Sequence, residues 1–131
     1  MKIFRVVLQV SDLAAAERFY SKLLGLKGRA VGGGRLYFDC GGVWLSLQDP
    51  GKKPKANSDD LYFAVAKLEG FHARAKKLRC LSKEDVHGES GGAMAKRPWG
   101  ERSFYVEDPF GNPLCFVEAG TEFTGRASAQ E

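Results

Sequence analysis

Hydrophobic residues recur with a period of two at the start of the chain, which is typical of a strand with one buried face. The apolar face carries Val6, Leu8 and Val10, and the opposite face carries Arg5, Val7 and Gln9. Between Leu13 and Leu24 the spacing changes to three and four residues, which predicts a helix with one apolar stripe. Ser11 or Asp12 can cap its first turn, and Gly25 suits its C-terminal end.

Three further strand-like segments follow, and glycines separate them at points that suit tight hairpins. These segments cover residues 27–31, 35–40 and 43–48. Residues 49–58 are polar and rich in turn formers, so we expect a connector without a buried face.

The same pattern then restarts. Its successive parts are a strand alternation over 60–65, a helical stretch over 68–78, a polar loop over 82–98, and strand patterns over 102–107 and 113–118. An offset of 55 residues places Val6, Leu8, Val10 and Leu13 on Leu61, Phe63, Val65 and Leu68. Near the end of each half the offset is 69 residues, so the second copy carries an insertion of 14 residues, within 82–98. The chain therefore contains an internal repeat.

The repeat predicts an α+β fold made of two βαβββ units. We place repeat one at 3–48, the linker at 49–58 and repeat two at 59–119, within a single domain over 1–120, followed by a flexible tail at 121–131. A four-stranded sheet with a helix on one face leaves its other face bare. Two such units form a cupped antiparallel or mixed sheet, with helices outside and the bare faces lining a cavity.

Composition narrows the setting of this domain. The chain has 131 residues, 44% of them hydrophobic and 27% charged, which suits one soluble domain with a core. No apolar run reaches the roughly 20 residues of a membrane span, and no signal-peptide pattern opens the chain. We expect a cytoplasmic protein with no membrane partner.

The net charge of +4 does not indicate nucleic-acid binding. The positive residues gather in a loop at 52–55 and on a helix surface at 74–79, where aromatic residues do not interleave with them. Three widely spaced cysteines, Cys40, Cys80 and Cys115, form no disulfide framework.

Two segments carry a family resemblance. The opening, RVVLQVSDL followed by Phe19-Tyr20 and LLGL at 23–26, is similar to the start of glyoxalase/bleomycin-resistance/dioxygenase (vicinal oxygen chelate) proteins. The closing segment at 97–118, RPWGERSFYVEDPFGNPLCFVE, resembles bleomycin-resistance proteins in particular. This superfamily carries isomerases, dioxygenases, thiol transferases and antibiotic-binding proteins on one fold, so the fold alone does not give the function.

The resemblance also implies where a metal would bind. Metal-dependent members place His or Gln on the first strand of a repeat and Glu on the last. The matching positions here are Arg5 and Ser46 in the first copy, and Asp60 and Cys115 in the second. Arginine has no lone pair to give, serine is a poor ligand, and two remaining ligands are too few for a tight transition-metal site. We therefore expect no metal and no other cofactor, with a divalent ion such as Ni, Zn, Mn or Fe as the alternative.

Arg5 and Asp60 occupy equivalent positions in the two copies. One interpretation is that they pair at the cavity centre, where an unpaired charge would be costly to bury. The other is that each is half-exposed and solvated. Cys115 is the best candidate for a functional thiol, and a neighbouring Arg5 could lower its pKa. The alternative is that Cys115 is a small buried side chain with only a packing role.

The predicted pocket suits a planar or heterocyclic organic ligand, held by stacking and by a few polar groups. Its lining residues are Arg5, Val7, Gln9, Trp44, Ser46, Gln48, Asp60, Tyr62, Trp99, Arg102 and Cys115. The leading interpretation is a metal-free, small-molecule-binding homodimer of the bleomycin-resistance type, linked to antibiotic resistance by kinship. The alternative is a divalent-metal-dependent enzyme of the glyoxalase or dioxygenase type, and a metal-free enzyme stands between them. Pairing of the repeats within one chain and exchange across a dimer both remain open.

Overall fold

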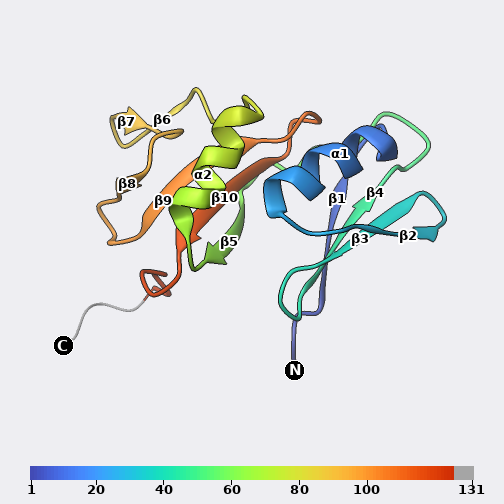
Figure 1. Ribbon diagram of the computed structural model, residues 1–131, viewed down its shortest axis with the longest axis horizontal. Helices are drawn as coiled ribbons and strands as arrows, with labels where there is room; N and C mark the ends of the chain where they lie inside the picture. Colours follow the sequence, from blue (N-terminus) through green and yellow to red (C-terminus); the bar gives the residue numbers. More distant parts are fainter. Residues whose placement is uncertain (126–131) are drawn as a thin grey trace.

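Two βαβββ modules make up the part of the chain that this computed structural model describes, residues 1–125 (Figure 1). The first module consists of β1 (Arg5–Gln9), α1 (Leu13–Leu24), β2 (Arg29–Gly32), β3 (Arg35–Asp39) and β4 (Trp44–Gln48). The second consists of β5 (Leu61–Val65), α2 (Leu68–Lys77), β6 (Asp85–Val86), β7 (Glu89–Ser90), β8 (Ala95–Lys96), β9 (Arg102–Glu107) and β10 (Pro113–Glu118). The α+β architecture of two βαβββ repeats is confirmed. The predicted tail begins at residue 121, and residues 126–131 lie outside the described part.

Each module has its own four-stranded mixed sheet. The strand order is β1-β4-β3-β2 in the first sheet and β5-β10-β9-β8 in the second, so the two orders correspond strand for strand. The first and last strands of each module run parallel, and the other pairs are antiparallel. Edge strands β1 and β5 do not pair with each other in the described chain, so the two sheets are separate. Both helices lie on the near side of the sheets in Figure 1.

Capping and burial explain where α1 forms. The Asp12 side chain accepts the backbone N–H of Ala15 at 3.0 Å, which selects Asp12 over Ser11 as the N-cap. Gly25 has a φ of 68° and ends the helix in the left-handed conformation that glycine adopts at low cost. The stripe that faces the sheet is buried and consists of Ala16, Phe19, Tyr20, Leu23 and Leu24.

The segment between α2 and β9 is more ordered than the polar loop that the sequence predicted. It contains the β6–β7 hairpin, which forms a separate two-stranded sheet, and β8, which completes the second sheet. Each of these strands has only two residues, which is too short for an alternation of apolar and polar residues to be recognised in the sequence.

The modules contact each other mainly through α1 and α2 and through buried polar side chains. Tyr20 of α1 donates its hydroxyl hydrogen to Asp108, in the turn between β9 and β10, at 2.6 Å. Asn112 of the same turn donates to the backbone oxygen of Gln9 at 2.9 Å and accepts the backbone N–H of Asn57, in the linker, at 3.0 Å. No helix among the described residues is both long enough and apolar enough to cross a membrane.

Candidate ligand-binding site

Side chains alternate between the two faces of each sheet. A helix covers one face, and we call the opposite, uncovered face the inner face. In the first sheet, Leu8 and Leu47 are fully buried in the core with α1, whereas Arg5 and Val7 point the other way and are exposed. In the second sheet, Phe63 packs against the core, whereas Tyr62 keeps 56% of its surface exposed. The predicted sorting of these strand positions is therefore confirmed.

Two arginines lie on aromatic rings of the first inner face. The guanidinium carbon of Arg5 is 4.9 Å from the ring centroid of Phe4 and 5.5 Å from that of Tyr37. Arg29 lies 5.6 Å from the ring centroid of Trp44, and the rings of Tyr37 and Trp44 are 6.3 Å apart. Cations at these distances are attracted by the negative faces of the rings. We call Arg5, Arg29, Tyr37 and Trp44 the basic aromatic cluster.

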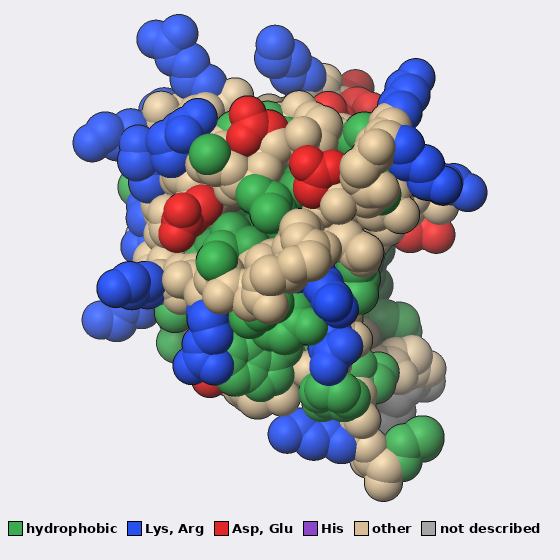
Figure 2. Space-filling model, turned by 90° about the vertical axis from the view of Figure 1, so that its right-hand side faces the viewer, with side chains coloured by type: hydrophobic (Ala, Val, Ile, Leu, Met, Phe, Trp, Pro, Cys, Tyr) green, Lys and Arg blue, Asp and Glu red, His purple; other side chains and the backbone are tan. Residues whose placement is uncertain are grey.

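The cluster lies on a module whose surface carries both apolar and positive side chains. Figure 2 views the side of the molecule that the first module forms, and in its lower half hydrophobic side chains are bordered by Lys and Arg. Tyr37 and Trp44 are half-buried, while Arg5 and Arg29 are exposed. The cluster is therefore accessible from outside.

Ser46 lies at the centre of the first inner face. It is opposite Val7 of β1 on one side and Tyr37 of β3 on the other. Only 1% of its surface is exposed, and its hydroxyl has no hydrogen-bond partner. A buried hydroxyl without a partner costs about 1–3 kcal/mol of stability. A hydrogen-bond partner for the Ser46 hydroxyl would therefore be stabilising.

The second inner face is partly covered by the segment inserted in that module. Tyr105, Cys115 and Val117 form a small buried cluster, against which Val86 of β6 packs. The chain that connects α2 to β9 therefore closes over the sheet at this point.

The chemistry of Cys115 differs from the prediction for a functional thiol. The residue is fully buried, and burial raises the pKa of its thiol to about 12, although hydrogen bonds with Ser103 and Tyr105 partly oppose this rise. The expectation that Arg5 lowers this pKa is therefore wrong for this chain, and the thiol is neutral at physiological pH. Burial also raises the pKa of Asp60.

Sequence reasoning missed Arg97, which is 2% exposed on the second inner face. Its guanidinium donates to the hydroxyl and backbone oxygens of Ser103 at 3.1 and 3.0 Å and to the backbone oxygen of Ala93 at 3.0 Å. Its guanidinium carbon lies 5.3 Å from the ring centroid of Tyr105, and Nη1 has no partner. Arg97 thus holds the inserted segment against β9. Its place in a polar loop gave no signal of burial.

Of the two interpretations of Arg5 and Asp60, the ion pair does not form within residues 1–125, where Arg5 is exposed and Asp60 is half-buried. The sheets that carry them are not joined, and the Arg5 guanidinium instead lies on its aromatic neighbours.

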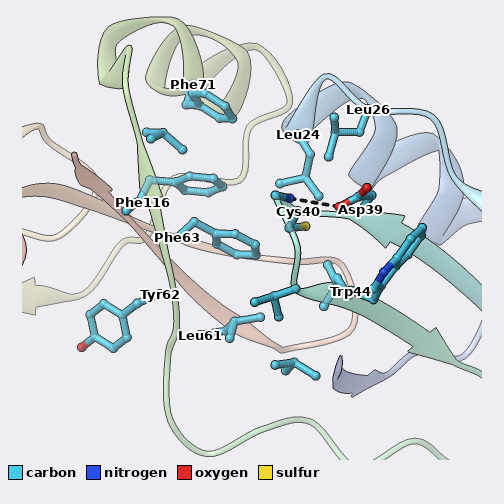
Figure 3. A pocket seen from close by; sticks show the side chains of 16 residues that line it. Leu24, Leu26, Asp39, Cys40, Trp44, Leu61, Tyr62, Phe63, Phe71 and Phe116 are labelled. Atoms are coloured by element: carbon cyan, nitrogen blue, oxygen red, sulfur yellow. Dashed lines mark hydrogen bonds between the residues drawn. The ribbon is translucent and has the colours of Figure 1, made fainter. Parts of the chain in front are cut away.

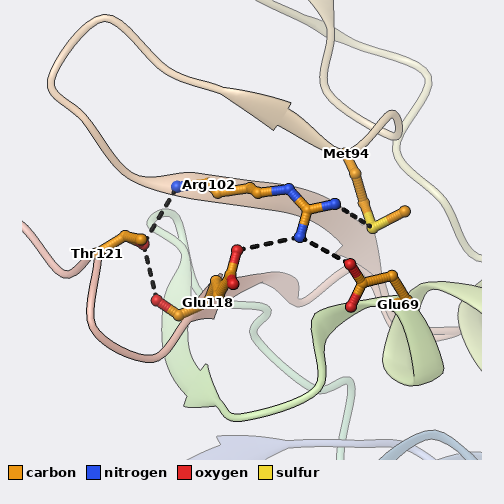
Figure 4. Close-up of polar contacts among 5 residues, drawn as sticks. All are labelled: Glu69, Met94, Arg102, Glu118 and Thr121. Atoms are coloured by element: carbon orange, nitrogen blue, oxygen red, sulfur yellow. Dashed lines mark hydrogen bonds and ion pairs between the residues drawn. The ribbon is translucent and has the colours of Figure 1, made fainter.

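Arg102 does not belong to the pocket, so this part of the predicted lining is wrong. Figure 4 shows its guanidinium between Glu69 of α2 and Glu118 of β10, each at 3.0 Å. Phe104, two residues further along β9, packs in the core beneath α2, so Arg102 lies on the helix-covered side of the sheet. The alternation within β9 was the signal that could have excluded it.

Two other predicted groups near the inner faces, Gln9 and Trp99, already form hydrogen bonds. The side-chain oxygen of Gln9 accepts the backbone N–H of Lys55 at 2.7 Å, which fixes the linker. Trp99 donates its indole N–H to Glu101 at 2.8 Å and, with Tyr62, borders a cavity of about 400 Å³. Gln48 is half-buried at the end of β4.

A larger cavity of about 520 Å³ lies between the modules (Figure 3). Phe63, Phe71 and Phe116 approach it from the second module, and Leu24 and Trp44 from the first. The cavity is almost wholly apolar. Most of its walls are helix-facing residues, which sequence analysis assigned to the core, so it was not predicted.

The donor set does not fit a transition metal. Residues 1–125 contain no group of three or more His, Cys, Asp or Glu side chains arranged to hold a metal ion. At the positions where metal-dependent relatives place ligands, Arg5 offers no lone pair and Cys115 is held as a neutral thiol.

Comparison with known proteins agrees with this fold. The family model described as "Glyoxalase/Bleomycin resistance protein/Dioxygenase superfamily" matches residues 2–116. An integron cassette protein from V. cholerae is 26% identical with a TM-score of 0.67, over 92% of this chain and 96% of that chain.

Two further solved structures carry names that describe an activity. A lactoylglutathione lyase from Agrobacterium tumefaciens is 25% identical with a TM-score of 0.62, over 90% of this chain and 93% of that chain. The oxidase ChaP-H1 is 18% identical with a TM-score of 0.76, over 96% of this chain and 99% of that chain, which shows a shared fold.

Proposed function

Because the chain belongs to the Glyoxalase/Bleomycin resistance protein/Dioxygenase superfamily, we propose that it binds a small planar or heterocyclic organic molecule at its inner faces without a metal. The observation that carries this proposal is the basic aromatic cluster, since two half-buried rings flanked by guanidinium groups suit a flat ligand. Sequestration of such a molecule, as in the bleomycin-resistance type, requires no catalytic group.

The residues at the ligand positions support a metal-free site. A divalent cation would meet the positive charge of Arg5 on the first inner face and the neutral thiol of Cys115 on the second. Only Asp60 offers an ionisable carboxylate at these positions, and one carboxylate does not retain a transition metal.

We further propose that the binding unit is a homodimer. Val7 and Tyr62 on the inner faces are 46% and 56% exposed, the neighbouring Phe4 is 55% exposed, and β1 and β5 each have one unpaired edge in the described chain. A second copy would cover this apolar surface and enclose the ligand. Light scattering after size exclusion tests this, and a monomer at micromolar concentration would contradict it.

The first experiment measures metal content after the purified protein has been offered excess Ni²⁺, Zn²⁺, Mn²⁺ and Fe²⁺ and then desalted. We expect a metal-to-chain ratio near zero. A thermal-shift screen of planar anionic, neutral and cationic compounds should then show stabilisation by at least one of them. Failure of every planar compound to stabilise the protein would refute the ligand-binding proposal.

The second candidate is a divalent-metal-dependent enzyme of the glyoxalase or dioxygenase type. The likeness to the lactoylglutathione lyase from Agrobacterium tumefaciens, at 25% identity, favours it. One tightly held ion per chain after desalting would make this candidate the leading one and would show that the ligand set lies elsewhere than at Arg5, Ser46, Asp60 and Cys115.

A further inference from the structure

The first inner face combines positive charge, flat rings and an unsatisfied hydroxyl in one place. We propose that it binds an aromatic acid: the carboxylate pairs with Arg5 or Arg29, and the ring stacks on Tyr37 or Trp44. This inference rests on the proposed ligand-binding function and names the chemical class of its ligand.

The charge on this face favours an anion. Arg5, Arg29 and Arg35 all project from the strands of the first sheet, and none forms an ion pair within residues 1–125. One carboxylate shares the face, that of Asp39. It is engaged in the turn that follows β3, where one oxygen accepts the backbone N–H groups of Gly41 and Gly42, each at 3.1 Å. Three guanidinium groups and one carboxylate leave this face with a net positive charge, which would repel a planar cation.

The two arginines beside these rings favour a carboxylate in particular. Their guanidinium carbons lie 5.5 and 5.6 Å from the ring centroids of Tyr37 and Trp44, and neither group forms an ion pair within residues 1–125, so their N–H groups are free for a ligand. A fork of such N–H donors matches the two oxygens of a carboxylate. Arg5 over Tyr37 and Arg29 over Trp44 place two of these forks around neighbouring rings.

Ser46 gives an independent reason to expect a ligand here. Its hydroxyl is buried between Val7 and Tyr37 in the strand register, and it has no partner. A polar group of the ligand that reaches it, after a small movement of the Tyr37 ring, would satisfy this hydroxyl. On the second inner face the buried Arg97 uses Nε and Nη2 on hydroxyl and backbone oxygens, and only its Nη1 lacks a partner, so that face offers fewer free donors than Arg5 and Arg29 do.

The test compares four bicyclic probes of similar size: 2-naphthoate, 2-naphthamide, 2-naphthylmethylammonium and the non-planar acid decahydronaphthalene-2-carboxylate. Binding is followed by isothermal titration calorimetry with the full chain at low ionic strength. We expect 2-naphthoate to bind at least about tenfold more tightly than the amide and the non-planar acid, since a charge-assisted hydrogen bond and ring stacking each contribute that much. The ammonium probe should bind least.

Variants locate the site. At least one of Arg5→Gln and Arg29→Gln should weaken 2-naphthoate binding about tenfold or more while leaving amide binding within about twofold. Ser46→Ala should weaken binding of the acid by a smaller factor. Arg18→Gln, which removes the same charge from the exposed surface of α1, is the matched control and should leave all affinities unchanged.

The outcomes separate the two proposals. If the amide or the ammonium probe binds as tightly as the acid, or if Arg5→Gln and Arg29→Gln bind the acid normally, the aromatic-acid assignment is wrong although the protein still binds a planar ligand. If none of the four probes binds, and the wider planar screen is also negative, both proposals fail.

Discussion

Replacement of Tyr20 by Phe should weaken the junction between the two modules without disturbing its packing. The tyrosine hydroxyl donates to Asp108 across the module boundary at 2.6 Å, and both residues are almost completely buried. The ring itself packs edge-on against Phe19, at a centroid distance of 5.1 Å, and lies 6.3 Å from Phe38. Phenylalanine keeps these contacts and removes one donor.

The expected loss follows from what remains around the carboxylate. Asp108 keeps three donors: the backbone N–H groups of Phe110 and Asn112, each at 2.8 Å, and the Asn112 side-chain amide at 2.9 Å. A hydrogen bond to a charged group contributes about 1.5–3 kcal/mol, and the remaining donors keep the loss in the lower part of that range. We therefore expect Tyr20→Phe to lower the free energy of unfolding by about 2 kcal/mol, and Tm by roughly 6–10 °C for a chain of this size.

Urea denaturation followed by circular dichroism, at one fixed protein concentration, measures the change. Tyr37→Phe is the matched control, because the Tyr37 hydroxyl makes no hydrogen bond among residues 1–125. A double-mutant cycle with Asp108→Asn should give a coupling energy of about 1 kcal/mol or more. If Tyr20→Phe lies within about 0.5 kcal/mol of the wild type, the buried bond does not stabilise the junction.

Three other perturbations test separate parts of the structure. Iodoacetamide should label the half-buried Cys40 well before Cys115, because the latter is fully buried with its pKa raised to about 12; early labelling of Cys115, mapped by mass spectrometry, would contradict its placement. Arg102→Ala should shift the urea midpoint only slightly and leave ligand affinity unchanged, since its ion pairs are solvent-exposed and lie outside the inner face. Gly34→Ala should destabilise the fold more than Gly32→Ala. Both glycines have positive φ, but a Cβ at Gly34 would come within 2.9 Å of a linker backbone oxygen, whereas a Cβ at Gly32 meets nothing within 4 Å; equal Tm values would refute this distinction.

The fold could be predicted because the repeat appears in local patterns. Alternation over β1 and β5 and the apolar stripe of α1 are each long enough to read, and the overlay of the two halves aligns them. β8 could not be predicted in the same way, because its two residues become a strand only through pairing with β9. The burial of Arg97 is likewise a tertiary effect, since its hydrogen-bond partners come from the inserted segment and from β9.

Strand alternation predicts which side chains of the candidate site share a face of a sheet. It does not predict how the two modules are arranged relative to each other. Parity places Arg5, Trp44 and Ser46 on one inner face, as the structure does. It also excludes Arg102, once Phe104 is taken as a core residue of the same strand. The ion pair between Arg5 and Asp60 required the two sheets to join within one chain, and strand alternation carries no information about that arrangement.

The first inner face reverses the electrostatics that the family resemblance implies for these positions. A metal site needs lone pairs that point toward a cation, whereas Arg5 and Ser46 at the corresponding positions supply N–H and O–H donors. Donors in that place attract the lone pairs of an anion, and the neighbouring Arg29 strengthens the same preference. The same strands that would hold a cation in a metal-dependent relative would therefore favour the proposed aromatic acid here, with the rings of Tyr37 and Trp44 available for its flat part.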